Sequence, residues 1–364
     1  MKVKIANLET GCILAKDVMG LSSFPIIPKS TVLTKQHLHV LQAFSIEDVS
    51  VERVKIDGSS FHPREMIEHD NPREDKLDEK TDFIKHYYEV VQEYKKEFIS
   101  WQSGVPINIA RIRGLFLPLF QHIEKDTEPI YTITHHTTKD DYVFHHGIAV
   151  GLISGLIAKK LDYEQGIYLQ IALAGLLADC GMAKVSPRIL FKKTSLTQKE
   201  FEEIKLHTIN SYQMVKDTPF LKPEAKLAIF QHHERMDGSG YPRSEENERI
   251  HPYSQIIAVA DMFHAMTSEK NYRSKQSPLR VLEMIKEDSF GKFNITVVNG
   301  ILSLLGNLPK GTVIRLTDGQ VAEVIFTRIE EPTRPLVKIK DTEQIVDLIK
   351  ERSLYIDTII NFNY

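Results

Sequence analysis

The central block of the chain, about residues 140–305, constrains the fold most. It is a succession of amphipathic helical patterns separated by turn signals, and it contains no convincing strand pattern. Two helix starts are well marked: Thr197 and Glu200 form a capping box, and Ser277 precedes Pro278 at a first helical position. We therefore expect an all-helical bundle in this block.

The segments before this block have other patterns. Residues 1–56 alternate in short apolar runs, with one helical pattern after Thr34, and predict a small α+β module. Residues 57–82 are polar and charged and predict a linker. Residues 83–139 predict a helical connector, broken near Gly104 and Pro106. Its apolar residues fall on two stripes: Tyr87, Val90, Val91 and Tyr94, then Ile109, Ile112, Phe116 and Leu119.

The C-terminal segment, residues 306–364, predicts a small β module. Two alternating runs in GTVIRLTDGQVAEVIF meet at Asp318-Gly319, a strong hairpin signal, and a third run, PLVKIK, follows. A short helical segment around Gln344 to Lys350 is expected to close the module. The chain is thus expected to be mainly α, an all-helical bundle flanked by a small N-terminal α+β module and a small C-terminal β module.

Charge and composition exclude several classes of partner. The 46 Lys and Arg residues against 49 Asp and Glu residues give a net charge of -3, so no basic field exists to hold a nucleic acid polymer or an anionic membrane. The chain lacks both a run of about 20 consecutive apolar residues and the apolar run of a signal peptide, so we expect a cytoplasmic protein. The two cysteines, Cys12 and Cys180, exclude a disulfide framework and a thiolate zinc cluster, and Cys180 is expected in the core.

Histidines and aspartates are placed unequally along the chain. Six histidines of the N-terminal half lie on polar or linker segments and are expected to be solvated: His37, His39, His62, His69, His86 and His122. Six ligand-type residues of the central block lie on, or at the end of, helices whose other face is apolar: His146, Asp179, His207, His232, His233 and Asp261. These six residues could converge in one bundle core.

Such a set suits a pair of divalent ions. Facing helices can present imidazoles and carboxylates to two ions roughly 3.5–4 Å apart, with one carboxylate shared between them. The ions then activate water near neutral pH and neutralise a phosphodiester oxygen during in-line displacement. Imidazole and carboxylate without thiolate favour iron, manganese or zinc.

The motifs of this block resemble a known family. The run QHHERMDGSGYP extends from Gln231 to Pro242, with LLADCGMAKVSPRIL and IKLHT before it and AVADMFHAMTSEKNYR after it. Together they strongly resemble the HD-GYP domain, the variant of the HD phosphohydrolase superfamily that hydrolyses cyclic di-GMP. The resemblance covers about residues 140–305.

The resemblance implies a role for each matched residue. His146 and Asp261 correspond to ligands of a first metal, Asp179 to the catalytic aspartate that bridges both metals, and His207, His232 and His233 to ligands of the second. Lys270 and Arg273 fall where the family binds nucleotide phosphates, and Asp237, Gly240, Tyr241 and Pro242 belong to the loop beside the substrate cleft. One or two divalent ions per chain, iron or manganese, are expected.

Three positions depart from the family pattern. The histidine of the HD pair is Ala178 here, the lysine that engages the scissile phosphate is Met182, and His264 stands where the family usually has aspartate. The first site therefore keeps three ligands instead of four. His264 or His145 could supply the missing imidazole; alternatively, His264 is a polar neighbour lining the cleft and His145 a surface side chain.

Two functions follow from the resemblance. The first is a cyclic di-GMP phosphodiesterase that hydrolyses the dinucleotide to pGpG or GMP with reduced activity. The second is an inactive HD-GYP module that binds cyclic di-GMP or a partner protein, through the GYP loop, as a signalling receptor. A homodimer formed through the helices between Phe83 and Lys125 is a further hypothesis.

Overall fold

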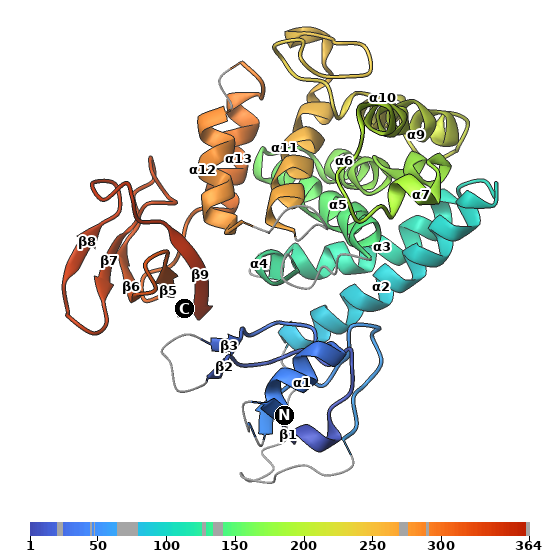
Figure 1. Cartoon of the computed structure of the whole chain (residues 1–364). Helices are drawn as coiled ribbons and strands as arrows, with labels where there is room; N and C mark the ends of the chain where they lie inside the picture. Colours follow the sequence, from blue (N-terminus) through green and yellow to red (C-terminus); the bar gives the residue numbers. More distant parts are fainter. Residues whose placement is uncertain are drawn as a thin grey trace. The chain divides into compact units, whose positions relative to one another are not determined.

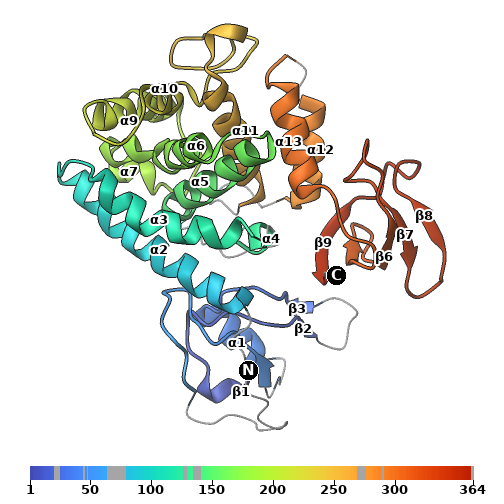
Figure 2. The same cartoon turned by 180° about the vertical axis from the view of Figure 1, so that it is seen from behind.

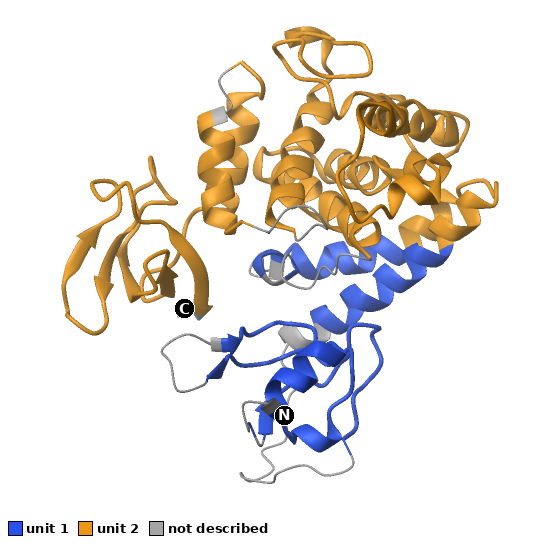
Figure 3. Cartoon of the chain, viewed as in Figure 1, with its two compact units in different colours: residues 1–96, 115–138 blue, residues 97–114, 139–364 orange. Residues whose placement is uncertain are grey.

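The computed structural model describes residues 1–19, 25–43, 46, 48–63, 79–125, 129–133, 141–268, 276–288 and 291–361. The chain divides into two compact units, coloured separately in Figure 3. One comprises residues 1–96 and 115–138, and the other residues 97–114 and 139–364. Helices α2 (Glu79–Gln102) and α3 (Ile109–Ile123) each contribute residues to both units.

The first unit begins with short strands and one helix. Strand β1 (Lys2–Lys4) is followed by the 3-10 helix η1 (Ile5–Asn7) and pairs antiparallel with β4 (Asp48–Ser50), while β2 (Val18–Met19) pairs with β3 (Pro25–Ile27). Helix α1 (Lys35–Ala43) begins directly after Thr34, as predicted. The alternating apolar residues form a buried core that includes Val3, Leu14, Leu33, Leu41, Val49 and Val51.

The predicted helical connector contains α2, α3 and the short helix α4 (Pro129–Ile133). The predicted break is confirmed, because α2 ends at Gln102 and α3 begins at Ile109. All eight residues of the two apolar stripes are buried. The periodicity of the sequence therefore identified the buried faces of both helices correctly.

The helical bundle occupies most of the second unit. Its helices are α5 (Tyr142–Lys160), α6 (Gln165–Leu177), α7 (Pro187–Leu190), α8 (Gln198–Lys205), α9 (His207–Val215), α10 (Pro223–Gln231), α11 (Pro252–Thr267), α12 (Pro278–Asp288) and α13 (Ile295–Leu305). Two 3-10 helices, η2 (Cys180–Lys184) and η3 (Asn247–Arg249), lie between them. Helix α5 packs against α6 and α11, and α10 packs against α6, α9 and α11 (Figures 1 and 2). The described residues of this block form no strand, in agreement with the prediction.

Helix α5 is buried on every side. Residues 144–158 are all buried without interruption, so this helix is not amphipathic as the sequence analysis expected. Two described segments, Tyr142–Lys160 and Gln165–Lys184, are long and apolar enough to cross a membrane. This is weak evidence, because the core helices of soluble proteins pass the same test, and 83% and 67% of these segments are buried inside the structure.

Both predicted helix starts in the bundle are confirmed. Thr197 Oγ1 accepts a hydrogen bond from the Glu200 amide, and the Glu200 carboxylate accepts one from the Thr197 amide. Such a cap contributes about 1 kcal/mol. Helix α12 begins at Pro278, and the hydroxyl of Ser277 donates to the carbonyl of Ile356.

The C-terminal segment is a five-stranded antiparallel sheet of strand order β8-β7-β6-β5-β9. Its strands are β5 (Val313–Leu316), β6 (Val321–Phe326), β7 (Leu336–Ile339), β8 (Ile345–Asp347) and β9 (Ile356–Asn361). The predicted hairpin joins β5 to β6, and Gly319 takes the left-handed backbone conformation (φ +88°) that this turn requires.

The prediction of a helix around Gln344 to Lys350 is wrong. Ile345 and Val346 instead pair with Lys338 and Val337 of β7, as the strand β8. The segment is too short to form a stable helix alone, and its β-branched residues fit a strand once a partner edge is available.

The sheet is attached to helix α12 by Arg334. Its guanidinium forms a two-pronged ion pair with Glu283 of α12, at 2.7 and 2.8 Å, and donates to the carbonyls of Leu348 and Leu354. The Tyr355 ring lies 4.3 Å from the Arg334 guanidinium and 4.2 Å from that of Arg280. The pair is largely buried, so the docking of the sheet depends on both charges being present.

Candidate metal centre

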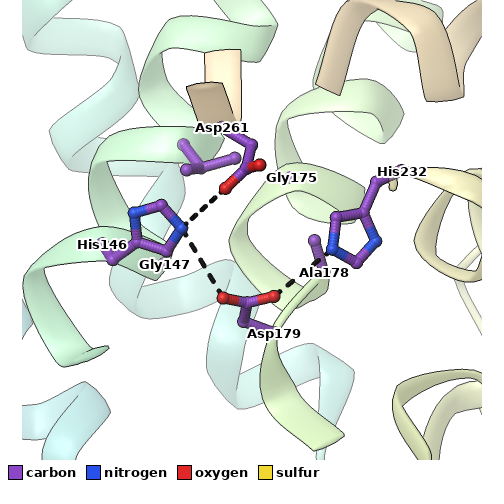
Figure 4. Close-up of a pocket in the computed structure, with 8 residues that line it drawn as sticks. His146, Gly147, Gly175, Ala178, Asp179, His232 and Asp261 are labelled. Carbon is purple, nitrogen blue, oxygen red and sulfur yellow. Dashed lines mark hydrogen bonds and ion pairs between the residues drawn. The ribbon is translucent and has the colours of Figure 1, made fainter. Parts of the chain in front are cut away.

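The six proposed metal ligands come from separate segments of the second unit and lie together in its core. His146 projects from α5, Asp179 follows α6, His207 begins α9, His232 and His233 follow α10, and Asp261 projects from α11. Figure 4 shows His146, Asp179, His232 and Asp261 directed toward one another.

Asp179 lies at the centre of this cluster. Its Oδ1 is 3.1 Å from Nε2 of His207 and 3.3 Å from Nε2 of His232, while its Oδ2 is 3.5 Å from Nε2 of His146. Ligand atoms of Asp179, His207, His232 and His233 all lie within 4.8 Å of one another. One carboxylate thus faces imidazoles on two sides.

Asp261 completes the other side of the cluster. Its Oδ1 is 2.9 Å from Nε2 of His146, and its Oδ2 is 3.6 Å from Nδ1 of His233. The six residues therefore form two overlapping groups that share Asp179. One contains His146, Asp179 and Asp261, and the other contains Asp179, His207, His232 and His233.

Backbone carbonyls orient two of the imidazoles. Nδ1 of His207 lies 2.7 Å from the Ile204 carbonyl, and Nδ1 of His232 lies 2.7 Å from the Ile229 carbonyl. A carbonyl only accepts, so each Nδ1 carries the proton and donates it. In the neutral ring, the lone pair of each Nε2 then points toward Asp179, which is the orientation a metal ligand requires.

A glycine allows η2 to approach α9 closely. A Cβ atom at Gly181 would lie 2.3 Å from the carbonyl oxygen of His207 and 2.4 Å from the amide nitrogen of Ser211. The Gly181 amide donates to the Ser211 hydroxyl at 2.8 Å. The position of His207 relative to Asp179 therefore depends on residue 181 having no side chain.

The electrostatics of the cluster favour charged carboxylates. Burial raises the pKa of Asp179, but the contacts with His207 and the other imidazoles outweigh burial and bring the pKa well below its usual range. Burial likewise raises the pKa of Asp261, but the hydrogen bond from His146 and the charges of His233 and His146 together lower it by more. Burial lowers the pKa of His207, but the Asp179 carboxylate raises it above its usual value. Burial and the neighbouring His232 hold the pKa of His233 well below its usual value.

These observations fit a divalent ion. Oδ1 of Asp179 is buried and, apart from the imidazole contacts, has no hydrogen-bond partner among the described residues. A buried carboxylate without such a partner is costly unless a cation compensates it. The donor set of imidazole nitrogen and carboxylate oxygen suits iron, manganese or zinc.

The group around His146 is incomplete, as the sequence indicated. Ala178 lines a small cavity, too narrow to admit a water molecule, together with Gly147, Val150 and Gly175, beside His146 and Asp179 (Figure 4). No described imidazole other than those of the cluster lines this cavity. Met182, in η2, is half-buried and supplies no cation.

The two alternative imidazoles lie elsewhere. Nδ1 of His264 is 2.9 Å from Nδ1 of His146, whereas Asp179 and Asp261 face Nε2 of the same ring. His264 is thus placed behind His146 and not beside the two carboxylates. His145 is 1% exposed, so the expected surface position is wrong.

A larger cleft of about 440 Å³ opens beside the cluster, within the size range of small-molecule sites. His233 and Asp261 line it, so the cleft and the cluster share residues. The other lining residues are Arg235, Ser239, Gly240, Tyr241, Met262, Ala265, Met266, Lys292 and Phe293.

The loop after His233 forms one wall of this cleft. The buried Glu234 carboxylate accepts hydrogen bonds from the amides of Arg243, at 2.7 Å, and Glu245, at 3.0 Å. The Tyr241 amide donates to the carbonyl of His233 at 3.1 Å, and a Cβ atom at Gly240 would lie 2.5 Å from that oxygen. The loop therefore closes tightly onto the residues that carry the imidazoles.

The predicted substrate-binding residues are placed differently. Gly240 and Tyr241 line the cleft, but Pro242 and Asp237 do not. Asp237 is exposed and accepts hydrogen bonds from the amide and hydroxyl of Ser239, which lower its pKa. Asp237 therefore shapes the loop. Lys270 and Arg273 lie outside the described residues.

Two cations that line the cleft, Arg235 and Lys292, were not predicted from the sequence. Nη1 of Arg235 donates to the carbonyls of His232, at 3.2 Å, and Glu234, at 2.8 Å, and the guanidinium lies 4.9 Å from the Phe293 ring. Among the described residues no carboxylate forms an ion pair with Arg235. Arg235 lies within the motif, between His233 and Asp237, and this position could have indicated a functional role. No motif surrounds Lys292.

The fold and the site together define a helical domain that gathers histidine and aspartate side chains for metal binding. Residues 133–294 match the family model of the HD domain. This segment is thus similar to HD domains, and its motifs resemble those of the HD-GYP type.

Several bacterial proteins are similar. The chain is 26% identical over 269 residues to "Cyclic di-GMP phosphodiesterase PA4108" of Pseudomonas aeruginosa, covering 72% of this chain and 64% of the relative. It is 34% identical over 168 residues to "Cyclic di-GMP phosphodiesterase" of Thermotoga maritima, covering 46% and 45% of the two chains. It is 32% identical over 151 residues to "3'3'-cGAMP-specific phosphodiesterase 3" of Vibrio cholerae, covering 41% and 32%. The chain thus spans less than two thirds of each relative.

A solved structure has the same fold. The HDG"Y"P protein Bd1817 from Bdellovibrio bacteriovorus superposes with a TM-score of 0.51 at 13% sequence identity, covering 84% of this chain and 99% of the other. At this identity the similarity concerns the fold alone.

Proposed function

We propose that this chain is a metal-dependent phosphodiesterase that hydrolyses cyclic di-GMP to pGpG or GMP. The observation that carries the proposal is Asp179, whose largely buried carboxylate faces His146 on one side and His207 and His232 on the other. Divalent ions at this position would supply Lewis-acid activation of water and of the phosphodiester.

The cleft suits an anionic substrate. Arg235, Lys292 and Tyr241 line it beside His233 and Asp261, which belong to the metal cluster. Arg235 stays charged although burial lowers its pKa, and the Nη1 contacts leave its Nε and Nη2 donors for a phosphate oxygen. The aromatic ring of Tyr241 offers a surface for a base to stack on.

The relatives support the substrate class. The Pseudomonas and Thermotoga proteins are named for cyclic di-GMP, and the Vibrio protein for 3'3'-cGAMP. Both are cyclic dinucleotides with two anionic phosphodiesters. Cyclic di-GMP is our first choice, and 3'3'-cGAMP is the comparison substrate.

A second candidate is an inactive receptor that binds the dinucleotide or a protein without turnover. Ala178 leaves the His146 group with one imidazole, and Met182 brings no cation to the site. Loss of one preorganised cation or donor typically costs 10²–10³ in rate. Ala178 and Met182 therefore favour a phosphodiesterase of reduced activity or a receptor without activity.

We also propose the identity of the metal ion, the location of the protein and its partners. Iron or manganese is the proposed metal, one or two ions per chain, with the complete group around His207 filled first. A bacterial source, a cytoplasmic location, a partner that contacts the Gly240–Pro242 loop and a homodimer belong to the same proposal.

The decisive experiment measures metal content and turnover on the same protein. The full chain is loaded with Mn²⁺ or Fe²⁺, and the products from cyclic di-GMP and 3'3'-cGAMP are separated by chromatography. Metal binding with a linear product supports the phosphodiesterase, whereas metal and bound dinucleotide without product support the receptor. Absence of metal binding would refute both.

Two arginine variants test the cleft. Arg235→Met should weaken dinucleotide binding about 10–100-fold, on the scale of hydrogen bonds to charged groups, and leave metal binding unchanged. Arg243→Met is the matched control, because this arginine of the same loop lies 5.3 Å from the Phe230 ring and does not line the cleft. Equal losses in both variants would show that the cleft is assigned wrongly.

A further inference from the structure

Helix α11 contacts both nitrogens of the His146 ring. Asp261 approaches Nε2 at 2.9 Å, and His264, one turn later on the same face, approaches Nδ1 at 2.9 Å. His146, Asp261 and His264 are all buried, at 4%, 8% and 0% exposure. The ring is therefore held from opposite edges by side chains of a single helix.

The contact between the two Nδ1 atoms requires a proton between them. At 2.9 Å, one imidazole must donate and the other accept, because two lone pairs would repel. If His146 is to offer the lone pair of Nε2 to a metal ion, its proton must sit on Nδ1. His264 Nδ1 is then the acceptor, and its own proton sits on Nε2, which lies 3.2 Å from the Ser268 hydroxyl.

We propose that His264 is a positioning residue for the metal ligand His146, which accepts the Nδ1 proton of that ring and so directs Nε2 toward Asp179 and Asp261. The inference deepens the proposed function, since it rests on His146 binding a metal. It also replaces the hypothesis that His264 supplies the missing imidazole ligand.

The remaining neighbours fit this role. Tyr142 stacks on His146, with ring centroids 5.0 Å apart, and its hydroxyl lies 3.1 Å from the same Nδ1. The Ser268 hydroxyl is buried against His264 and can accept from its Nε2. Of the two acceptors that face the His146 Nδ1 proton, His264 Nδ1 is nearer, at 2.9 Å, than the Tyr142 oxygen, at 3.1 Å.

The chemistry of the acceptor predicts a measurable effect. A neutral imidazole accepts the Nδ1 proton more weakly than a carboxylate would, and so makes His146 a less basic ligand. Removing such an outer partner typically lowers metal affinity 10–100-fold. The group of His146, Asp179 and Asp261 should therefore bind its ion weakly, and its affinity should follow the residue at position 264.

The experiment compares Mn²⁺ binding by the full-length protein and four variants, by titration calorimetry and by electron paramagnetic resonance of free Mn²⁺. His264→Leu should lower the affinity of the weaker site 10–100-fold and leave the stronger site unchanged. His264→Asn should restore affinity to within a few-fold, because its amide oxygen takes the place of Nδ1, and His264→Asp should raise it above wild type. Thr267→Val is the control, since the hydroxyl of this buried threonine donates to backbone carbonyls of α11, those of Phe263 and His264, and not to the His264 ring.

Each outcome has a defined meaning. If wild type binds no Mn²⁺, both this inference and the proposed function fail. If wild type binds Mn²⁺ and His264→Leu binds it equally well, only this inference fails. Should His264→Leu not fold in circular dichroism, the folded Asn variant decides, and loss of the weaker site there overturns the inference.

Discussion

Replacement of Gly181 by alanine tests how the backbone positions the candidate metal centre. The added Cβ atom would lie 2.3 Å from the His207 carbonyl oxygen and 2.4 Å from the Ser211 amide nitrogen. Both atoms belong to the backbone of α9 and cannot rotate away. Relief of the overlap to an ordinary contact requires α9 to move by about 1 Å relative to η2.

That displacement is large for a metal ligand. His207 is the first residue of α9, and its Nε2 lies 3.1 Å from Asp179. Metal–ligand distances tolerate about 0.2 Å, so a shift of about 1 Å removes His207 from the coordination sphere. We expect Gly181→Ala to lower Mn²⁺ affinity at least 10–100-fold. Overpacking should also lower the free energy of unfolding by about 1–3 kcal/mol, or about 2–4 °C of Tm per kcal/mol.

The assay is calorimetric titration with Mn²⁺ and thermal unfolding in a metal chelator. Gly166→Ala is the matched control, because no atom lies within 4 Å of the added Cβ in α6. Alanine there should leave Mn²⁺ affinity unchanged and stabilise the helix by up to about 1 kcal/mol. If Gly181→Ala folds and binds Mn²⁺ within twofold of wild type, the positioning argument is refuted.

Three further predictions follow from the structure. Arg334→Met should remove the two-pronged ion pair with Glu283, which keeps only Arg280 Nη1 at 3.0 Å, and lower the free energy of unfolding by about 1.5–3 kcal/mol. Thermal unfolding and limited proteolysis of the C-terminal sheet would detect this loss, and an unchanged Tm would contradict it. The His207 imidazole holds its proton up to a raised pKa, and Mn²⁺ must displace this proton, so Mn²⁺ affinity should fall by about tenfold per pH unit below that pKa and stay constant above it. Titrations in buffers of different ionisation enthalpy should reveal the released proton. Binding that does not depend on pH would argue against this prediction. The double change Ala178→His with Met182→Lys should raise any phosphodiesterase rate at least tenfold, and an unchanged rate would locate the defect elsewhere.

Local sequence signals predicted much of the fold because they depend on near neighbours. The capping box at Thr197 and the Asp318-Gly319 turn each involve a few consecutive residues, and both are present in the structure. The helical spacing of the apolar residues from Tyr87 to Tyr94 predicted that this face is buried, and it is. The strand Ile345–Asp347 was mistaken for a helix because three residues are too few to distinguish the period of a strand from that of a helix, although its partner β7 directly precedes it.

The sequence predicted which residues form the candidate metal centre, but it did not predict which other residues contact them. The motif HHERMDGSGYP, with Asp179 and Asp261, identified the cluster because metal chemistry restricts the residue types that can serve. Arg235, Lys292 and the buried position of His145 depend on which helices enclose them, and one-dimensional spacing does not contain that information.

The sequence by itself determined the helical character of the central block, the donor set of the candidate metal centre and the absence of an imidazole at Ala178. Residue identity and local periodicity are sufficient for each of these. Only the tertiary structure decided that His264 lies against Nδ1 of His146, that Gly181 controls the position of His207, and that Arg235 opens onto the cleft. These are relations between segments distant in the sequence, and they arise when packed helices bring their side chains within hydrogen-bonding distance.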